Sequence, residues 1–91
     1  MTERKIELAL VKQVKAGGGI ALKFISPGIA GVPDRLVLLP GGRVLFVELK
    51  APGEKPRPLQ RKRSAQLQSL GFTVLTIDNM KAVQEVFAHE I

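Results

Sequence analysis

The sequence predicts an α/β protein with the element order αβββαβ(α) and a mixed sheet flanked by helices. Three observations support this fold class. An amphipathic helical pattern opens the chain, three short apolar segments separated by Gly and Pro follow it, and a helical segment then precedes a fourth apolar segment. A strand, a crossover helix and another strand of this length indicate parallel pairing with a right-handed connection.

Length and composition limit the architecture. The chain has 91 residues, which fit one small domain, residues 1–91, with a modest core. Cysteine is absent and His89 is the only histidine, which excludes a disulfide framework, a thiolate zinc site and multi-histidine metal chemistry. The apolar segments are too short to span a bilayer, and the first residues lack the apolar region of a signal peptide. We therefore expect a cytoplasmic protein with no membrane partner.

The first helix is expected at residues 2–15 and the first strand at residues 20–25. Apolar residues recur at every fourth position of the helix, which defines one buried face: Ile6, Leu10 and Val14. The glycines at 17–19 end this helix. Residues 20–25 are mostly apolar or β-branched, and the Gly- and Pro-rich segment 26–33 that follows predicts a loop.

A hairpin is expected next, with strands at residues 35–39 and 43–50. Both alternating sets of positions are apolar in these strands, so we expect central strands with helices packed on each face. If residues 40–42 form a three-residue loop, Asp34 falls opposite Glu48 on one face. A two-residue loop at Gly41-Gly42 would instead pair Asp34 with Leu49 and turn it to the other face.

The second half of the chain predicts a helix, a strand and a last helix. A Pro-rich connection covers residues 51–58, and Pro58 suits the first turn of a helix that runs to Leu70 and ends at Gly71. Residues 72–77 then predict a strand. Either of the next two residues can cap the last helix, which carries three apolar side chains: Asp78 or Asn79, then Val83, Val86 and Phe87.

Positive charge is concentrated in one segment. The net charge is +6 and the isoelectric point is about 10.2, the direction expected for a nucleic-acid partner. The segment between residues 55 and 63 holds five basic residues: Lys55, Arg57, Arg61, Lys62 and Arg63. These side chains would hold backbone phosphates without reading sequence. The alternative is an ordinary solvated helix face.

Two carboxylates and a lysine give the strongest functional signal. In the three-residue-loop register, Asp34 and Glu48 have Cβ atoms about 4.5–5.5 Å apart, close enough to bind one cation. Glu48 and Lys50 lie two residues apart on one strand and therefore share a face. A divalent ion on such carboxylates can activate water and stabilise phosphate charge. The alternatives are a turn aspartate, a strand-end glutamate and a simple Lys50 salt bridge.

The segments Gly31-Val-Pro-Asp-Arg-Leu36 and Phe46-Val-Glu-Leu-Lys50 resemble the PD-(D/E)XK nuclease superfamily, and within it the VRR-NUC (virus-type replication-repair nuclease) domain. The resemblance covers nearly the whole chain and implies a restriction-endonuclease-like fold. It implies Asp34, Glu48 and the main-chain carbonyl of Leu49 as ligands of Mg²⁺ or Mn²⁺. Small members of this type are similar to phage and prophage nucleases that cut branched DNA as homodimers.

Further residues are expected to act around this site. Lys50 would orient or deprotonate the attacking water, or stabilise phosphate charge. Glu7 matches the acidic residue of the first helix, with Glu3 as the competitor, and Gln60 would direct its amide at a phosphate or a metal-bound water. Two basic residues near the site are expected to contact phosphate: Lys23 and Arg35.

The resulting hypothesis is a metal-dependent endonuclease for duplex or branched DNA, such as Holliday junctions. Tyr and Trp are absent and only four Phe are present, which argues against a dedicated single-strand binder. Small size and 45% hydrophobic content beside a charge of +6 favour a homodimer. Two other classes stay open, a non-catalytic nucleic-acid-binding module with the nuclease fold and a basic structural or ribosome-associated protein.

Overall fold

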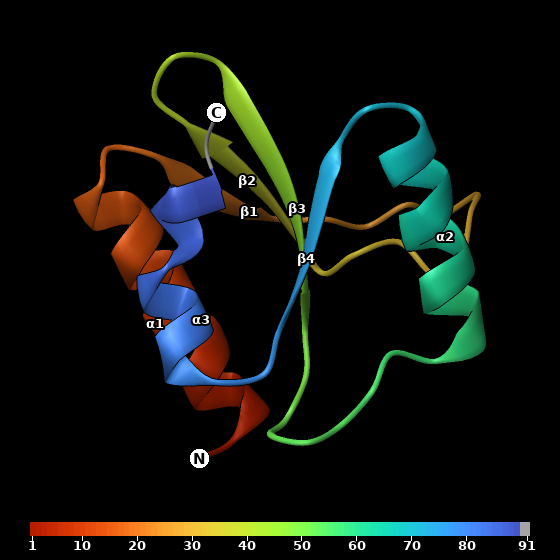
Figure 1. The fold of residues 1–91 in the computed structure, drawn as a ribbon, viewed down its shortest axis with the longest axis horizontal. Helices are drawn as coiled ribbons and strands as arrows, with labels where there is room; N and C mark the ends of the chain where they lie inside the picture. The colour runs from red at the N-terminus through yellow and green to blue at the C-terminus, as the bar shows by residue number, and fades with distance from the viewer. Residues whose placement is uncertain (90–91) are drawn as a thin grey trace.

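A four-stranded sheet lies between two helical layers in the computed structural model, which describes residues 1–89 (Figure 1). Helices α1 (Glu3–Ala16) and α3 (Met80–Gln84) lie on one side of the sheet, and α2 (Pro58–Ser69) lies on the other. A short 3-10 helix, η1 (Val86–His89), follows α3. No helix among the described residues is long and apolar enough to cross a membrane. The order is the predicted αβββαβα.

The sheet has the predicted mixture of pairings. Its strands are ordered as in the chain: β1 (Ile20–Lys23), β2 (Arg35–Leu39), β3 (Arg43–Leu49) and β4 (Thr73–Ile77). The first three strands pair antiparallel, and β4 pairs parallel with β3 after the crossover through α2. The hairpin strands β2 and β3 are therefore central, as predicted.

The β2–β3 register is the one that the three-residue loop requires. Leu39 pairs with Arg43 and Arg35 pairs with Val47. Gly41 and Gly42 both have positive φ, 84° and 77°, which glycine adopts without the steric cost of a Cβ. One further step along the same register sets Asp34 opposite Glu48. The two-residue loop is excluded.

The main core lies between the sheet and the α1 side. The buried face of α1 is the predicted stripe of Ile6, Leu10 and Val14. Every second residue of the central strands points to it, and these residues are also buried: Val37, Leu39, Leu45, Val47 and Leu49. The residues between them, which include Glu48, point to the α2 side.

The central strands β2 and β3 have helices on both sides of the sheet, as expected, but the α2 side is covered less completely toward the edge strand β1. On the α2 side, Phe46 is buried and its ring contacts Phe24 and Phe72, with centroids 5.6 and 5.5 Å away. Ile20 and Leu22 of β1, however, remain 52% and 41% exposed. The reason is that α2 packs against β4 and is itself polar, so it leaves the β1 end of this face open.

The loop between β1 and β2 is fixed against α2 and delivers Asp34 to the sheet. Gly31 has φ of 84°, and a Cβ placed on it would lie 2.7 Å from the main-chain oxygen of Leu59. The Nε–H of Arg63 donates a hydrogen bond to the oxygen of Ala30 at 3.0 Å. Close packing of this loop therefore requires glycine at position 31.

We predict that Gly31→Ala lowers the free energy of unfolding by about 2 kcal/mol, because alanine resists positive φ and its methyl group meets a main-chain oxygen. Gly28→Ala is the matched control in the same loop, since a Cβ there has nothing within 4 Å. It should change stability by less than about 0.5 kcal/mol. Equal effects in urea denaturation would contradict this account of the loop.

Candidate active site

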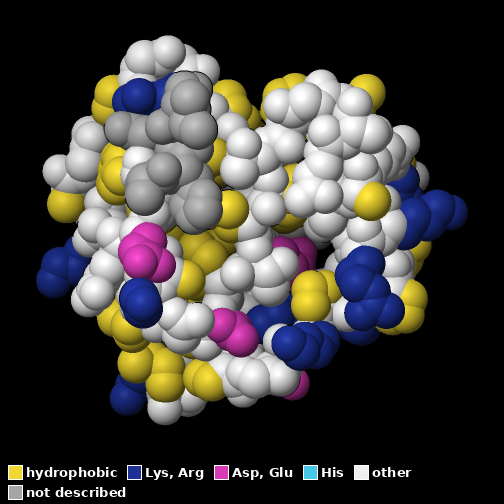
Figure 2. All heavy atoms as spheres, in the orientation of Figure 1, with side chains coloured by type: hydrophobic (Ala, Val, Ile, Leu, Met, Phe, Trp, Pro, Cys, Tyr) yellow, Lys and Arg dark blue, Asp and Glu magenta, His cyan; other side chains and the backbone are white. Residues whose placement is uncertain are grey.

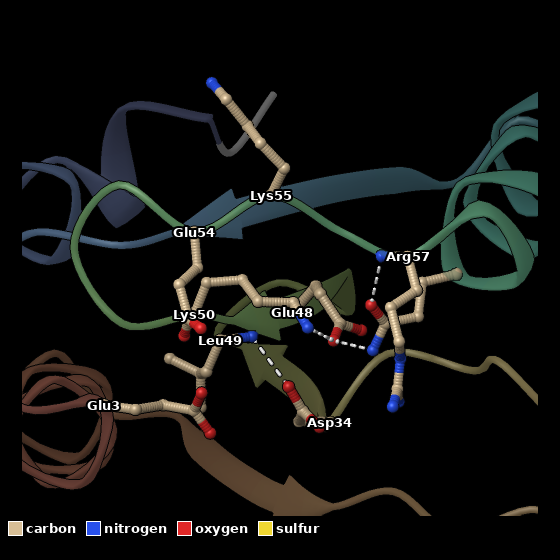
Figure 3. Close-up of a pocket in the computed structure, with 9 residues that line it drawn as sticks. Glu3, Asp34, Glu48, Leu49, Lys50, Glu54, Lys55 and Arg57 are labelled. Atoms are coloured by element: carbon tan, nitrogen blue, oxygen red, sulfur yellow. Dashed lines mark hydrogen bonds and ion pairs between the residues drawn. The ribbon is translucent and has the colours of Figure 1, made fainter.

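The two predicted carboxylates meet at the end of β3, on the α2 face of the sheet (Figure 3). The Oδ2 atom of Asp34 accepts a hydrogen bond of 2.7 Å from the main-chain N–H of Leu49. This bond fixes Asp34 beside the strand that carries Glu48, whose side chain is only 2% exposed. The hairpin register therefore brings both carboxylates to one place.

Glu48 is held through one of its two oxygens. Its Oε2 atom accepts a hydrogen bond of 2.7 Å from Nε2 of Gln60, and Nζ of Lys50 lies 3.8 Å from the same oxygen. The other oxygen, Oε1, is buried and has no hydrogen-bond partner. An unpartnered buried oxygen is unfavourable by about 1–3 kcal/mol, so this atom is a ready acceptor for a cation or a donor.

Burial raises the pKa of Glu48 from its ordinary value of 4.5 to about 7. The nearby carboxylate of Asp34 is the second cause of this raised pKa, because two negative charges so close repel each other. Lys50 and then Arg57 act in the opposite direction by attracting the ionised form. Without a bound cation, Glu48 therefore holds its proton up to about neutral pH.

A polar cavity of about 380 Å³ opens over these groups. Its lining comes from the start of α1, the ends of β2 and β3, and the segment that enters α2: Glu3, Asp34, Glu48, Leu49, Lys50, Glu54, Lys55, Arg57 and Gln60. Figure 3 shows the Lys55 side chain extending away from the two carboxylates. Four of the five residues predicted to be catalytic thus line one cavity: Asp34, Glu48, Lys50 and Gln60. Leu49, the third predicted metal ligand, lines it as well.

Gln60 connects the start of α2 to the carboxylate. Its Oε1 atom accepts a hydrogen bond of 2.8 Å from the main-chain N–H of Arg57, while its Nε2 donates to Glu48. Both ends of the amide are occupied, which fixes its orientation. The side chain of Gln60 is buried, so it is not an ordinary surface glutamine, and it positions Glu48.

Glu7 lies outside this cavity. Its Oε2 accepts two hydrogen bonds from Arg35, at 3.1 Å from Nε and 2.9 Å from Nη2, and Arg4 contributes an ion pair at 3.3 Å. Glu7 lines a neighbouring cavity of about 250 Å³, together with Lys23 and Asp34. Glu3 lines both cavities. Of the two candidate acidic residues on α1, Glu3 is therefore the one that reaches the cavity with Asp34 and Glu48.

Comparisons with known proteins find relatives that cover most of the chain. No family model matches the chain. A protein of Acyrthosiphon pisum secondary endosymbiont phage 1, named "Putative nuclease p44", is 56% identical over 77 residues, which cover 85% of this chain and 83% of that protein. A solved structure described as a VRR_NUC domain is 30% identical, covers 98% of both chains and has a TM-score of 0.88.

The chain belongs to the VRR-NUC family.

The fold, with its restriction-endonuclease-like mixed sheet, is that of the family, as the resemblance implied. The VRR-NUC site also suits a hard divalent cation, since its donors are carboxylate and carbonyl oxygens. Among the side chains that the structure describes, no group of three or more acidic or histidine residues could hold a metal. Asp34 and Glu48 would therefore need the Leu49 carbonyl, water or substrate oxygens to complete the coordination. The buried, unpartnered Oε1 of Glu48 fits such a role.

The predicted phosphate-binding residues are divided by the structure. Arg35 is largely buried and bonds Glu7 and the oxygen of Ala21, the latter at 2.9 Å. Arg61 donates to the oxygen of Pro56 at 2.9 Å, and Arg63 donates to Ala30 and Gln66. These contacts tie parts of the protein together. Lys55 and Lys62 are exposed, and Figure 2 shows Lys and Arg side chains over α2 and beside the acidic side chains near the middle of this face.

Sequence reasoning did not single out Glu54, which lines the main cavity. It lies in the irregular Pro-rich segment, where no period of two or four residues assigns a direction to a side chain. Only its place four residues after Lys50 in a short connection could have drawn attention to it.

The pKa of Glu48 predicts a dependence of stability on pH in the absence of divalent metal. The unfolded chain releases this proton near pH 4.5 and the folded protein near pH 7, so stability falls as pH rises between these values. The shift between the two pKa values corresponds to a loss of about 3 kcal/mol in the free energy of unfolding, and this loss is complete above pH 7. We expect Glu48→Gln, which cannot ionise, to gain about this much relative to the wild type between pH 4.5 and pH 8.

The measurement is urea denaturation in the presence of a chelator at both pH values. Glu54→Gln, which removes an exposed carboxylate, is the control for the general effect of losing one negative charge. A stability difference between Glu48→Gln and wild type that stays constant with pH would show that the buried Glu48 carboxyl ionises normally.

Proposed function

We propose that this VRR-NUC protein is a divalent-metal-dependent endonuclease that hydrolyses phosphodiester bonds in DNA. The observation that carries the proposal is the buried Asp34–Glu48 pair, with one unpartnered carboxylate oxygen, next to Lys50 in a polar cavity. A protein that only binds nucleic acid gains nothing from a buried carboxylate with an unpartnered oxygen. The relative named as a nuclease supports the same activity.

Asp34, Glu48 and the carbonyl of Leu49 would hold Mg²⁺ or Mn²⁺, which supplies charge stabilisation at the phosphate and activates water. Gln60 keeps Glu48 in place through Oε2 and leaves Oε1 directed to the ligand. The Leu49 N–H keeps Asp34 beside it. These two hydrogen bonds preorganise both carboxylates before substrate arrives.

Lys50 is placed to act on the water or on the phosphate. The water oxygen forms the new bond to phosphorus, the bond from phosphorus to the 3′ oxygen breaks, and the products carry 5′-phosphate and 3′-hydroxyl ends. The proton of the water passes to the basic group at the site, and the 3′ oxygen takes a proton from solvent. With its Nζ 3.8 Å from Glu48, Lys50 either accepts the proton or stabilises the phosphate charge.

The proposed substrate is duplex or branched DNA, including four-way junctions. The exposed side chains of Lys55 and Lys62 contact backbone phosphates, which gives binding without sequence selectivity. Three of the four Phe, Phe24, Phe46 and Phe72, contact one another in a ring cluster in which Phe46 is buried, so its face cannot stack on a base. The phage relative supports a place in the cytoplasm of a bacterial or phage-infected cell.

We predict that Asp34→Asn and Glu48→Gln each lower metal-dependent cleavage by at least about 100-fold, because each removes a charged ligand while keeping its size. Single-turnover rates with Mg²⁺ or Mn²⁺ on labelled junction, flap, duplex and single-stranded DNA measure this effect and the preferred structure. Lys12→Ala, an exposed change on α1, is the control. Cleavage by the double variant at the wild-type rate would refute the proposal.

The active unit is proposed to be a homodimer formed through the open face of β1. Ile20 and Leu22 are half exposed there. They belong to β1, whose outer edge has no partner strand among the described residues. Burying such side chains stabilises association by about 25 cal/mol for each Å² of apolar surface removed from water. A two-fold dimer would also present two active sites to a symmetric junction.

Light scattering at working concentration should therefore give the mass of two chains for the wild type and of one chain for Leu22→Glu, which places a charge in the apolar contact. Leu8→Glu is the matched control, because Leu8 is 50% exposed on α1 in the other layer. A monomeric wild type would rule out the dimer without affecting the proposed chemistry.

A further inference from the structure

Arg57 differs from the other arginines near the cavity in having an uncommitted guanidinium. Arg35, Arg61 and Arg63 each donate side-chain hydrogen bonds to acceptors of the protein. Within the part of the chain that the structure describes, Arg57 donates a hydrogen bond from its main-chain N–H and none from its guanidinium. Its donors therefore remain available to a ligand.

The side chain of Arg57 lies at the cavity that holds the two carboxylates. It lines the main cavity together with Asp34, Glu48 and Lys50 (Figure 3). Its charge is close enough to Glu48 to lower the pKa of that carboxyl, against the effect of burial. Lys55, two residues earlier, extends away from the same groups. Arg57 is thus the arginine that adds positive charge at the cavity.

The backbone of Arg57 is fixed before any ligand binds. It stands between Pro56 and Pro58, and the proline that follows confines it to an extended conformation, seen as φ of −69° and ψ of 159°. Its N–H donates to Gln60, which in turn donates to Glu48. The Cα of Arg57 is therefore held at a defined distance from Glu48 through a single side chain.

We infer that Arg57 is a further catalytic residue, which binds the non-bridging oxygens of the phosphate that is cleaved. This inference rests on the proposed nuclease activity. A guanidinium donates two parallel hydrogen bonds to two phosphate oxygens, a geometry that lysine cannot reproduce. A donor fixed at the reacting group stabilises the charge that develops there, whereas a residue on flanking phosphates contributes only to binding.

The first test separates catalysis from binding. Single-turnover cleavage at saturating enzyme should fall about 100-fold for Arg57→Ala. Arg57→Lys should recover only a small part of the rate, because one point charge replaces a bidentate donor. Lys81→Ala, an exposed change on α3 that removes the same charge, is the matched control and should cleave at the wild-type rate. A saturating rate for Arg57→Ala within about twofold of wild type overturns the inference.

The second test locates the phosphate. In the Glu48→Gln background, which binds without cutting, Arg57→Ala should weaken binding of the preferred substrate about 10-fold. This loss should shrink to less than about twofold when a neutral methylphosphonate replaces the scissile phosphate, since the partner of Arg57 is then already removed. It should persist when the methylphosphonate is at a neighbouring position. The opposite pattern would assign Arg57 to a flanking phosphate.

The two failures are distinguishable. If the wild type cleaves DNA, Glu48→Gln does not, and Arg57→Ala cleaves as fast as wild type, the proposed function stands and the role of Arg57 is refuted. If the wild type cleaves none of the DNA structures with either metal, the proposed function fails and this inference fails with it.

Discussion

The buried carboxylate of Glu48 is the constraint to which the surrounding structure is fitted. Ionised carboxylates are strongly disfavoured away from water, and Glu48 stands on a central strand at 2% exposure. One oxygen is satisfied by Gln60, and this bond requires a polar, buried residue on the first turn of α2. That requirement places α2 over β4 and the end of β3, with the Pro-rich segment carrying Arg57 past the cavity. The remaining oxygen is left for a ligand. The unfavourable burial of this unpartnered oxygen and the proposed binding of a cation therefore involve the same atom.

Alternation along β2 connects this site to the opposite layer. Asp34 and Arg35 are neighbours, so their side chains point to opposite faces of the sheet. Asp34 joins Glu48 on the α2 side, while Arg35 forms a two-bond ion pair with Glu7 of α1 and also bonds the oxygen of Ala21. Pairing in a partly buried place offsets the desolvation of both charges. The dipeptide therefore anchors α1 and positions a carboxylate of the proposed active site, and a shift of one residue in the hairpin would destroy both contacts.

The order of elements, the hairpin register and the meeting of Asp34 with Glu48 follow from the sequence, because a period of two and a three-residue glycine loop leave one consistent arrangement. The position of Glu7 does not follow, since helical spacing defines a face of α1 but not its rotation and height against the sheet. The exposure of one side of β1 does not follow from the sequence either. Apolar residues at Ile20 and Leu22 indicate a covered face, yet the helix that would cover it, α2, buries only Gln60.

Not every basic side chain of this protein is available to bind a phosphate backbone. Arg61 and Arg63 lie in the most basic segment, but their guanidinium groups donate to Pro56, Ala30 and Gln66 and so hold the loops around the cavity. An arginine that donates to a main-chain oxygen is held in one orientation by that bond, so fewer of its five donors can turn to a phosphate. Exposed lysines do not have this competing role, because a flexible ammonium group keeps its charge in water. The proposed function therefore divides the basic side chains: exposed lysines would supply the diffuse attraction to a phosphate backbone, whereas Arg61 and Arg63 hold the loops around the cavity.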